Sequence, residues 1–178
     1  MPPQPDGLWQ VVYSGDKWVT SPGADKYRRG LYTFWRRTTP HPMMASFDAP
    51  SREYCVLKRS RSNTPLQALN ILNDPAFIEA AQALARKIAA QPSTDIKDRV
   101  TFAFRTCLAR APKQTEVDRL LSLYQTELAN YRQDTKAAIK IASSEIGKAP
   151  ARAEVAELAA WTVVANVLLN LDEIITKG

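Results

Sequence analysis

Residues 62–88, SNTPLQALNILNDPAFIEAAQALARKI, contain two helix starts in succession. Thr64 and Asp74 each precede a proline. A side chain of this kind caps the free amides of a first turn, and proline takes the first helical position. The apolar residues that follow recur at helical spacing: Leu66, Leu69 and Leu72 in the first segment, and Phe77, Ile78, Ala81, Leu84, Ala85 and Ile88 in the second. The stretch therefore predicts two consecutive helices with a sharp bend between them.

Further helices are predicted downstream of this pair. Residues 96–108 place apolar side chains at helical spacing, at Ile96, Val100, Ala103, Phe104, Cys107 and Leu108. Residues 113–133 repeat the pattern on one face, at Val117, Leu120, Leu121, Tyr124, Leu128 and Tyr131. A shorter, alanine-rich helix is predicted over residues 136–144.

The last predicted helix covers residues 152–169 and is apolar on most of its circumference, with Val155, Leu158, Trp161, Ala165 and Leu168 directed inward. Such a helix belongs at the centre of a bundle, where several other helices pack against it. The whole pattern predicts a mainly α-helical fold, a bundle of about five to six helices with an irregular N-terminal arm.

The N-terminal third differs in composition from the rest. Residues 1–26 contain repeated prolines and glycines and are predicted as the irregular arm, which leaves residues 27–178 as the helical domain. Residues 26–38, KYRRGLYTFWRRT, predict an amphipathic helix whose apolar side holds Tyr27, Leu31, Tyr32, Phe34 and Trp35 and whose other side holds Arg28, Arg29, Arg36 and Arg37. Residues 39–61 contain closely spaced prolines and are predicted as a loop.

Composition narrows the class of protein. At 178 residues and 45% hydrophobic content, the chain can form one domain with a substantial core, with or without an arm. No apolar run approaches the roughly 18 residues that span a bilayer, and the start MPPQPDGLWQ has neither the basic end nor the apolar core of a signal peptide. The net charge of +6 is concentrated in residues 1–61, which hold ten Lys or Arg against five Asp or Glu.

Several kinds of catalytic or metal site find no support in the sequence. Cys55 and Cys107 form no C-x-x-C pair, and the one histidine, His41, lies between prolines. No G-x-S-x-G elbow or phosphate-binding glycine loop is present. We therefore expect no metal and no cofactor in this chain. For the two cysteines, a disulfide remains open, and buried free thiols are favoured.

Two sets of residues remain as candidates for binding. The basic set, Arg28, Arg29, Arg36, Arg37, Arg52, Lys58, Arg59 and Arg61, lies among most of the aromatic residues and suits an anionic ligand. The second set, Asp48, Arg52 and Glu53, lies in the segment FDAPSRE of residues 47–53. The competing interpretation is structural and is favoured: the aromatic residues form a core, the arginines pair with carboxylates or helix ends, and Asp48 caps a turn.

Four blocks of sequence together resemble a known family. They are YRRGLYTFWRRT (residues 27–38), FDAPSREYC (47–55), SNTPLQALNILNDPAFIEAA (62–81) and AAWTVVANVLLNLDE (159–173). In this order they resemble the C-terminal domain of large planctomycete proteins known as domain of unknown function 1553, of which this chain looks like the C-terminal part. The resemblance implies export to the periplasm or beyond and an upstream haem c domain, so that haem is expected only there. It implies no reaction.

These observations lead to one functional hypothesis and two alternatives. The first is a non-catalytic helical module of an exported multidomain protein that scaffolds or docks upstream domains of the same or a partner polypeptide. The second is part of a polysaccharide hydrolase or haem-coupled redox enzyme that uses the FDAPSRE segment. The third is anion binding through the basic N-terminal third, with an anionic glycan favoured over nucleic acid. Whether the chain is an enzyme stays open.

Overall fold

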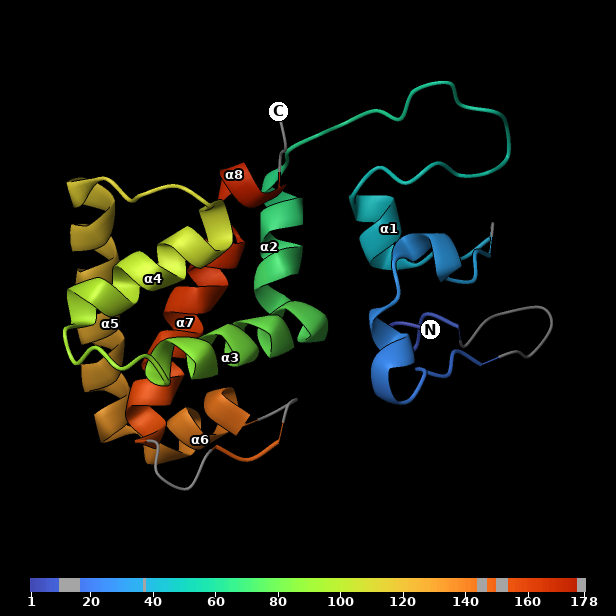
Figure 1. Cartoon of the computed structure of the whole chain (residues 1–178). Coiled ribbons are helices and arrows are strands. Elements are labelled where there is room, and N and C mark those ends of the chain that lie inside the picture. The colour runs from blue at the N-terminus through green and yellow to red at the C-terminus, as the bar shows by residue number, and fades with distance from the viewer. Residues whose placement is uncertain (10–16, 37, 144–146, 150–153, 176–178) are drawn as a thin grey trace. The chain divides into compact units, whose positions relative to one another are not determined.

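The computed structural model describes residues 1–9, 17–36, 38–143, 147–149 and 154–175, and within them all regular structure is helical. The predicted mainly α-helical fold is therefore confirmed. The chain forms two compact units, Met1–Asn70 and Ile71–Gly178 (Figure 1), and each is considered by itself. The predicted division into a 1–26 arm and a 27–178 helical domain stays a prediction.

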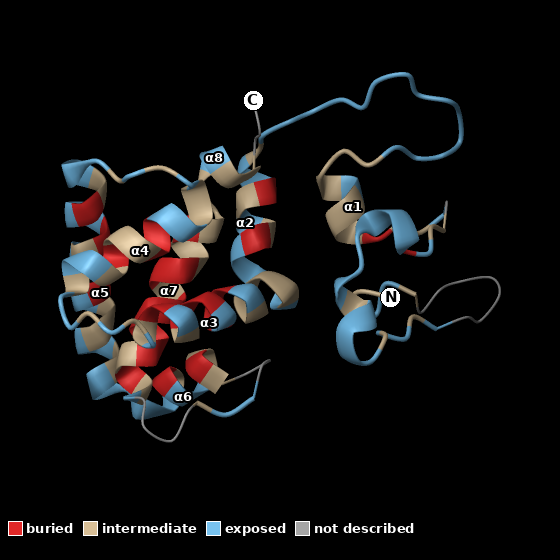
Figure 2. Ribbon diagram, viewed as in Figure 1, coloured by how far each residue is buried: buried red, intermediate tan, exposed pale blue. Residues whose placement is uncertain are grey.

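The second unit is a helical bundle built around one helix, α7. Its elements are α3 (Pro75–Ala89), α4 (Ile96–Leu108), α5 (Gln114–Gln133), α6 (Thr135–Ser143), α7 (Val155–Leu169) and α8 (Asp172–Ile175). Helix α7 packs against α3, α4, α5 and α6 (Figure 1), and most of its residues are buried (Figure 2). This confirms the prediction of a central helix. The predicted ends at residues 144 and 152 lie outside the described residues.

Helices α3 and α4 each begin after an aspartate whose side chain caps the first turn. The carboxylate of Asp74 accepts a hydrogen bond from the amide of Ala76 at 2.8 Å, with Pro75 at the first helical position as predicted. Asp95 caps α4 in the same way, through the amide of Lys97 at 2.9 Å. Both carboxylates satisfy amides that have no partner within their own helix.

Aromatic packing joins α5 to α7 in the core. The rings of Tyr124 and Trp161 lie 4.3 Å apart at an interplanar angle of 31°, and Trp161 is fully buried. Burial raises the pKa of Tyr124 to about 12, so its hydroxyl stays neutral at physiological pH. Glu157 Oε1 accepts from Arg99 Nη1 at 2.7 Å and from the indole Nε1 of Trp161 at 3.4 Å. The edge of this aromatic pair is thus held by an ion pair.

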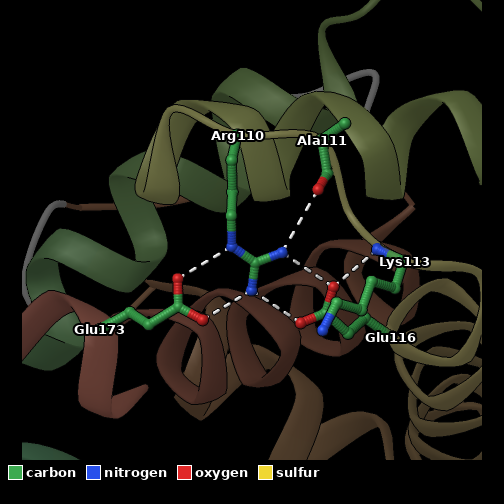
Figure 3. Close-up of polar contacts among 5 residues, drawn as sticks. All are labelled: Arg110, Ala111, Lys113, Glu116 and Glu173. Atoms are coloured by element: carbon green, nitrogen blue, oxygen red, sulfur yellow. Dashed lines mark hydrogen bonds and ion pairs between the residues drawn. The ribbon is translucent and has the colours of Figure 1, made fainter.

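Arg110 connects three segments at another edge of the bundle (Figure 3). Its guanidinium donates to both carboxylate oxygens of Glu116 on α5, at 2.8 and 3.0 Å, and to both oxygens of Glu173 on α8, at 2.6 and 2.8 Å. Glu116 also accepts from the amide of Lys113 at 2.6 Å, which caps α5. Two bidentate pairs on one guanidinium fix the geometry of this corner. We call Arg110, Glu116 and Glu173 the arginine fork.

The first unit contains little α-helix. Its elements are the 3₁₀ turns η1 (Gly23–Tyr27) and η2 (Gly30–Tyr32), the helix α1 (Pro42–Ser46), and α2 (Pro65–Asn73), which spans the boundary between the units. The prediction of one helix over residues 26–38 is wrong. The backbone is extended at Arg28 and Thr33, on either side of η2.

A glycine in the middle of the segment and the lack of a buried apolar face explain why these residues do not form one helix. A Cβ atom at Gly30 would lie 3.3 Å from Cε of Met44, which places Met44 directly against the Gly30 backbone. Glycine also has low helix propensity. The aromatic and aliphatic side chains of the segment share no buried helical face, since Tyr27, Leu31, Tyr32 and Phe34 are all exposed.

The buried face of helix α2 is not the one that the sequence predicts. The leucines of the predicted apolar stripe, Leu66, Leu69 and Leu72, are exposed, and the buried residues are Gln67 and Ile71. Gln67 and Ile71 are four positions apart and therefore lie on one face of the helix. None of the described helices has the length and apolar character needed to cross a membrane.

Candidate functional site

The segment singled out by the sequence, FDAPSRE and the residues after it, forms a long exposed loop in the first unit. Every residue from position 50 to position 63 is exposed, and Leu57 is as accessible as in an open chain, at 107%. The loop begins at the end of α1 and returns to the start of α2. Its base, rather than its tip, is where polar contacts are concentrated.

Asp48 closes the base of the loop from one side. It follows α1 in the left-handed conformation, with φ of 57°, and the amide of Ala49 donates back to the carbonyl of Met44 at 2.9 Å. This is the Schellman end of a helix, in which aspartate tolerates the left-handed position better than most residues. The carboxylate Oδ2 then accepts from both the amide and the hydroxyl of Ser62, each at 2.7 Å. These hydrogen bonds from Ser62 hold the pKa of Asp48 below its usual value.

Gln67 completes the closure from the α2 side. Its buried amide group donates to the carbonyl of Ser46 at 2.8 Å and to Oγ of Ser62 at 3.0 Å. Its Oε1 accepts from the backbone amide of Thr64 at 3.0 Å, and the backbone amide of Gln67 donates to Oγ1 of Thr64 at 3.3 Å. The two residues therefore form a capping box. Asn70 adds a bond to Oγ of Ser46 at 2.8 Å. We call Ser46, Asp48, Ser62 and Gln67 the loop clasp.

The predicted carboxylate site is dispersed in the structure. Asp48 bonds to Ser62, the guanidinium of Arg52 lies 5.3 Å from the ring centroid of Trp35, and the amide of Glu53 donates to Ser51 Oγ at 3.3 Å. Arg52 itself has a φ of 63°, which turns the chain at this point. Within the part of the chain that the structure describes, no hydrogen bond or ion pair links Asp48, Arg52 and Glu53 to one another. Their binding role stays a prediction.

The predicted basic set also divides among different contacts. Arg28 pairs with Asp25 at 2.7 Å, and the guanidinium of Arg36 lies over the ring of Trp9, 4.7 Å from its centroid. The positive charge of Arg59 contributes to the lowered pKa of the Asp48 carboxyl group. Arg29 and Arg61 are exposed, and Arg37 lies outside the described residues. An anion-binding role for the set stays a prediction.

The cysteines are both free thiols. The expectation that both thiols are buried is wrong for Cys55, which is exposed on the loop. Cys107 is half-buried in α4, where burial raises the pKa of its thiol. The predicted inward direction of Cys107 agrees with its packing against the core of the second unit. Among the described residues, no three His, Cys, Asp or Glu side chains are placed to hold a metal ion together.

Sequence reasoning singled out Asp48 but missed Ser46, Ser62 and Gln67, which hold the base of the loop together with it. Gln67 had a visible signal, because Thr64 and Gln67 match the S/T-x-x-E/Q pattern of a capping box. The same pattern gave no sign that the amide also reaches Ser46 and Ser62. The partner of Asp48, fourteen positions away, depends on the path of the whole loop.

Comparison with known proteins gives one positive result. No curated protein and no solved structure matches the chain. The model of one protein family, described as PSD1, protein of unknown function (DUF1553), matches residues 1–124. These residues include the loop, the loop clasp and the Arg110 and Glu116 members of the arginine fork. The chain therefore belongs to the DUF1553 family.

Proposed function

We propose that this chain is a non-catalytic module that docks onto another protein domain through loop residues 50–61. The observation that carries the proposal is the contrast between the loop and its base. The loop side chains are exposed throughout, whereas the loop clasp holds both ends by hydrogen bonds of 2.7 to 3.0 Å. A loop with fixed ends loses less conformational entropy when a partner binds.

The composition of the loop supports a protein partner. Tyr54, Val56 and Leu57 are exposed beside Arg52, Lys58, Arg59 and Arg61, with Glu53 as the one acidic residue. Aromatic, aliphatic and arginine side chains are common in the centres of protein interfaces. An acidic surface with an apolar hollow would complement the loop, because the four cations exceed the one carboxylate by three.

The resemblance suggests where such a partner is found. Upstream domains of the same or a partner polypeptide, in an exported planctomycete protein, are the first candidates for the acidic surface. A location in the periplasm or outside the cell, and an association with a haem c domain, are parts of the same proposal. An anionic glycan is the alternative ligand for the basic residues of the N-terminal third.

The enzyme alternatives receive less support from the geometry. In a hydrolase that used FDAPSRE, Asp48 would serve as an acid or a base. Its carboxylate instead accepts two hydrogen bonds from Ser62, and these lower its pKa. A carboxylate stabilised in its charged form is a weak base.

Binding to separately produced upstream domains of the family tests the proposal, with calorimetry at low and at physiological salt. Leu57→Ser and Arg59→Glu should each weaken binding by about tenfold or more, as central interface residues do. Ile139→Ser and Arg119→Glu are matched controls, because both positions are exposed in the second unit. Equal affinity of all four variants, or binding to none of the upstream domains, would rule out docking through the loop.

A further inference from the structure

A cavity of about 510 Å³ lies in the first unit, between residues 4–9 and residues 17–20. Its size falls in the range of about 300 to 1,000 Å³ that small-molecule sites occupy. Its lining includes the indoles of Trp9 and Trp18 and four polar side chains, Gln4, Asp6, Lys17 and Thr20. None of these residues belongs to the loop or to the loop clasp.

The two indole rings are held in place by residues that do not line the cavity. Trp18 donates from Nε1 to the carbonyl of Pro2 at 2.8 Å, and its ring lies 5.4 Å from that of His41. The ring of Trp9 lies 6.3 Å from Phe34 and meets the ring of Trp18 edge to face at 5.3 Å. His41 is itself buried, with its Nε2 at 3.0 Å from the carbonyl of Pro3. The aromatic part of the wall is therefore formed without any ligand.

The charges at the cavity disfavour a charged ligand. Asp6 and Lys17 carry opposite charges, so the described residues of the lining are together formally neutral. A cationic ligand would normally use the faces of the indoles. The guanidinium of Arg36 already lies over the ring of Trp9, 4.7 Å from its centroid, and would repel such a ligand. Among the described residues of the lining, an anion would find one cationic partner, Lys17, and would face the carboxylate of Asp6.

The polar groups of the lining suit hydroxyl groups. They include an anionic acceptor at Asp6, a cationic donor at Lys17, and side chains at Gln4 and Thr20 that can donate and accept. Two atoms of the lining residues, Oε1 of Gln4 and Nε1 of Trp9, are shielded from solvent and have no hydrogen-bond partner among the described residues. Because neither atom is open to solvent, a ligand meets the other polar groups of the lining, above all the exposed side chains of Asp6, Lys17 and Thr20.

We propose that this cavity binds a neutral saccharide, whose C–H faces pack against Trp9 and Trp18 and whose hydroxyls bond to Gln4, Asp6 and Lys17. A sugar combines apolar faces with a dense set of donors and acceptors, as this lining requires. The inference goes beyond docking through the loop and does not depend on it. The site would give the module a second, carbohydrate-binding function.

The experiment measures binding of disaccharides to the whole chain by calorimetry and by saturation-transfer NMR. Cellobiose, maltose and N,N′-diacetylchitobiose serve as neutral probes, and digalacturonic acid and the chitosan dimer serve as anionic and cationic probes. At least one neutral probe should bind, and more tightly than either charged one. Failure of all three neutral probes, or a preference for a charged probe, would overturn the inference.

Variants locate the binding within the molecule. Asp6→Ala and Lys17→Ala, both at exposed positions, should each weaken binding of the neutral probe by about tenfold, as loss of a hydrogen bond to a charged group does. Asp118→Ala and Lys136→Ala, at exposed positions of the second unit, are the matched controls and should leave binding of the neutral probe unchanged. Trp9→Ala should abolish binding of the neutral probe, with near-UV circular dichroism as the check on folding.

Unchanged binding in both Asp6→Ala and Lys17→Ala would place the sugar elsewhere and refute the site, whatever the result for Trp9→Ala. Leu57→Ser should retain sugar binding, which separates this test from that of docking.

Discussion

The guanidinium of Arg110 holds the carboxylate of Glu173 through two hydrogen bonds, from Nε at 2.8 Å and from Nη2 at 2.6 Å. The same group holds Glu116 through two further bonds (Figure 3). Helix α8 has only four residues, too few to be stable by itself. The contact therefore helps to hold α8 beside the connection between α4 and α5.

The first prediction concerns the shape of the Arg110 side chain. Arg110→Lys keeps the charge but cannot form two bidentate pairs, since an ammonium group lacks the planar fork. We expect a lower melting temperature and faster hydrogen exchange at residues 172–175. Arg119→Lys, at an exposed position of α5, is the matched control. Equal melting temperatures of the two variants would show that the fork adds nothing beyond its charge.

The second prediction is a pH dependence from Glu116. The hydrogen bonds from Arg110, with that from the amide of Lys113, lower the pKa of Glu116 from 4.5 to about 2. A carboxylate with a lowered pKa stabilises the folded state above its unfolded pKa, and this contribution disappears as the pH falls towards the folded pKa. Stability should therefore decrease between about pH 4.5 and about pH 2. In Glu116→Gln this part of the decrease should be absent, as urea unfolding at a series of pH values would show. An unchanged pH profile would contradict the assignment.

The second unit was predictable because its signals are local. The cap at Asp74, the proline after it and the apolar spacing of α3 lie within a few residues of one another. The central position of α7 followed from its apolar circumference, since a helix without a polar face must be covered on all sides. Arg110 gave no such signal, because its partner Glu173 is distant in sequence and only the folded chain brings the two together.

The first unit was less predictable because few of its residues form regular helices. The aromatic spacing of residues 27–35 matched a helical face, yet Trp9 and Trp18, from the N-terminal segment, are the rings that pack with Phe34 and His41. On α2, the prediction followed the spacing of the leucines and left out Gln67, whose buried side-chain amide has three hydrogen-bond partners at the base of the loop. A buried glutamine with satisfied hydrogen bonds can thus determine which face of a helix is turned inward.

The third prediction tests the core at Trp161. Replacing this fully buried indole by alanine removes its contact with Tyr124 and leaves a cavity. Large-to-alanine changes of aromatic core residues cost about 3–5 kcal/mol in free energy of unfolding. Trp161→Phe should cost less, because it keeps a ring against Tyr124. Urea titration followed by circular dichroism at 222 nm measures both values. A cost for Trp161→Ala below that of Trp161→Phe would refute the packing described for α7.

The fourth prediction concerns the buried amide of Gln67. Gln67→Leu has a similar volume but leaves the carbonyl of Ser46 and the amide of Thr64 without their present partner. An unsatisfied buried polar group costs about 1–3 kcal/mol, and since Ser46 and Thr64 are partly buried, the variant should lower the free energy of unfolding by up to that amount. The neighbouring Leu66→Ala, at an exposed position of the same helix, should change it little. A neutral Gln67→Leu variant would mean that the loop clasp is not maintained in solution.

The last prediction separates the two roles of Asp48. Its backbone occupies the left-handed region, which asparagine and glycine adopt at lower cost than alanine, and its carboxylate binds Ser62. Asp48→Asn should preserve the turn and part of the contact, Asp48→Gly should preserve only the turn, and Asp48→Ala should strain the turn and lose the contact. Trypsin cleavage after Arg52, Lys58, Arg59 and Arg61 reports the mobility of the loop. The rate of cleavage should rise in the order wild type, Asp48→Asn, Asp48→Gly, Asp48→Ala.

The pattern of rates separates the two roles. If Asp48→Gly and Asp48→Ala are cleaved at the same rate, the contact with Ser62 alone holds the loop. If Asp48→Asn and Asp48→Gly are cleaved as slowly as the wild type, the turn alone holds it. Identical rates in all four proteins would show that Asp48 does not restrain the loop.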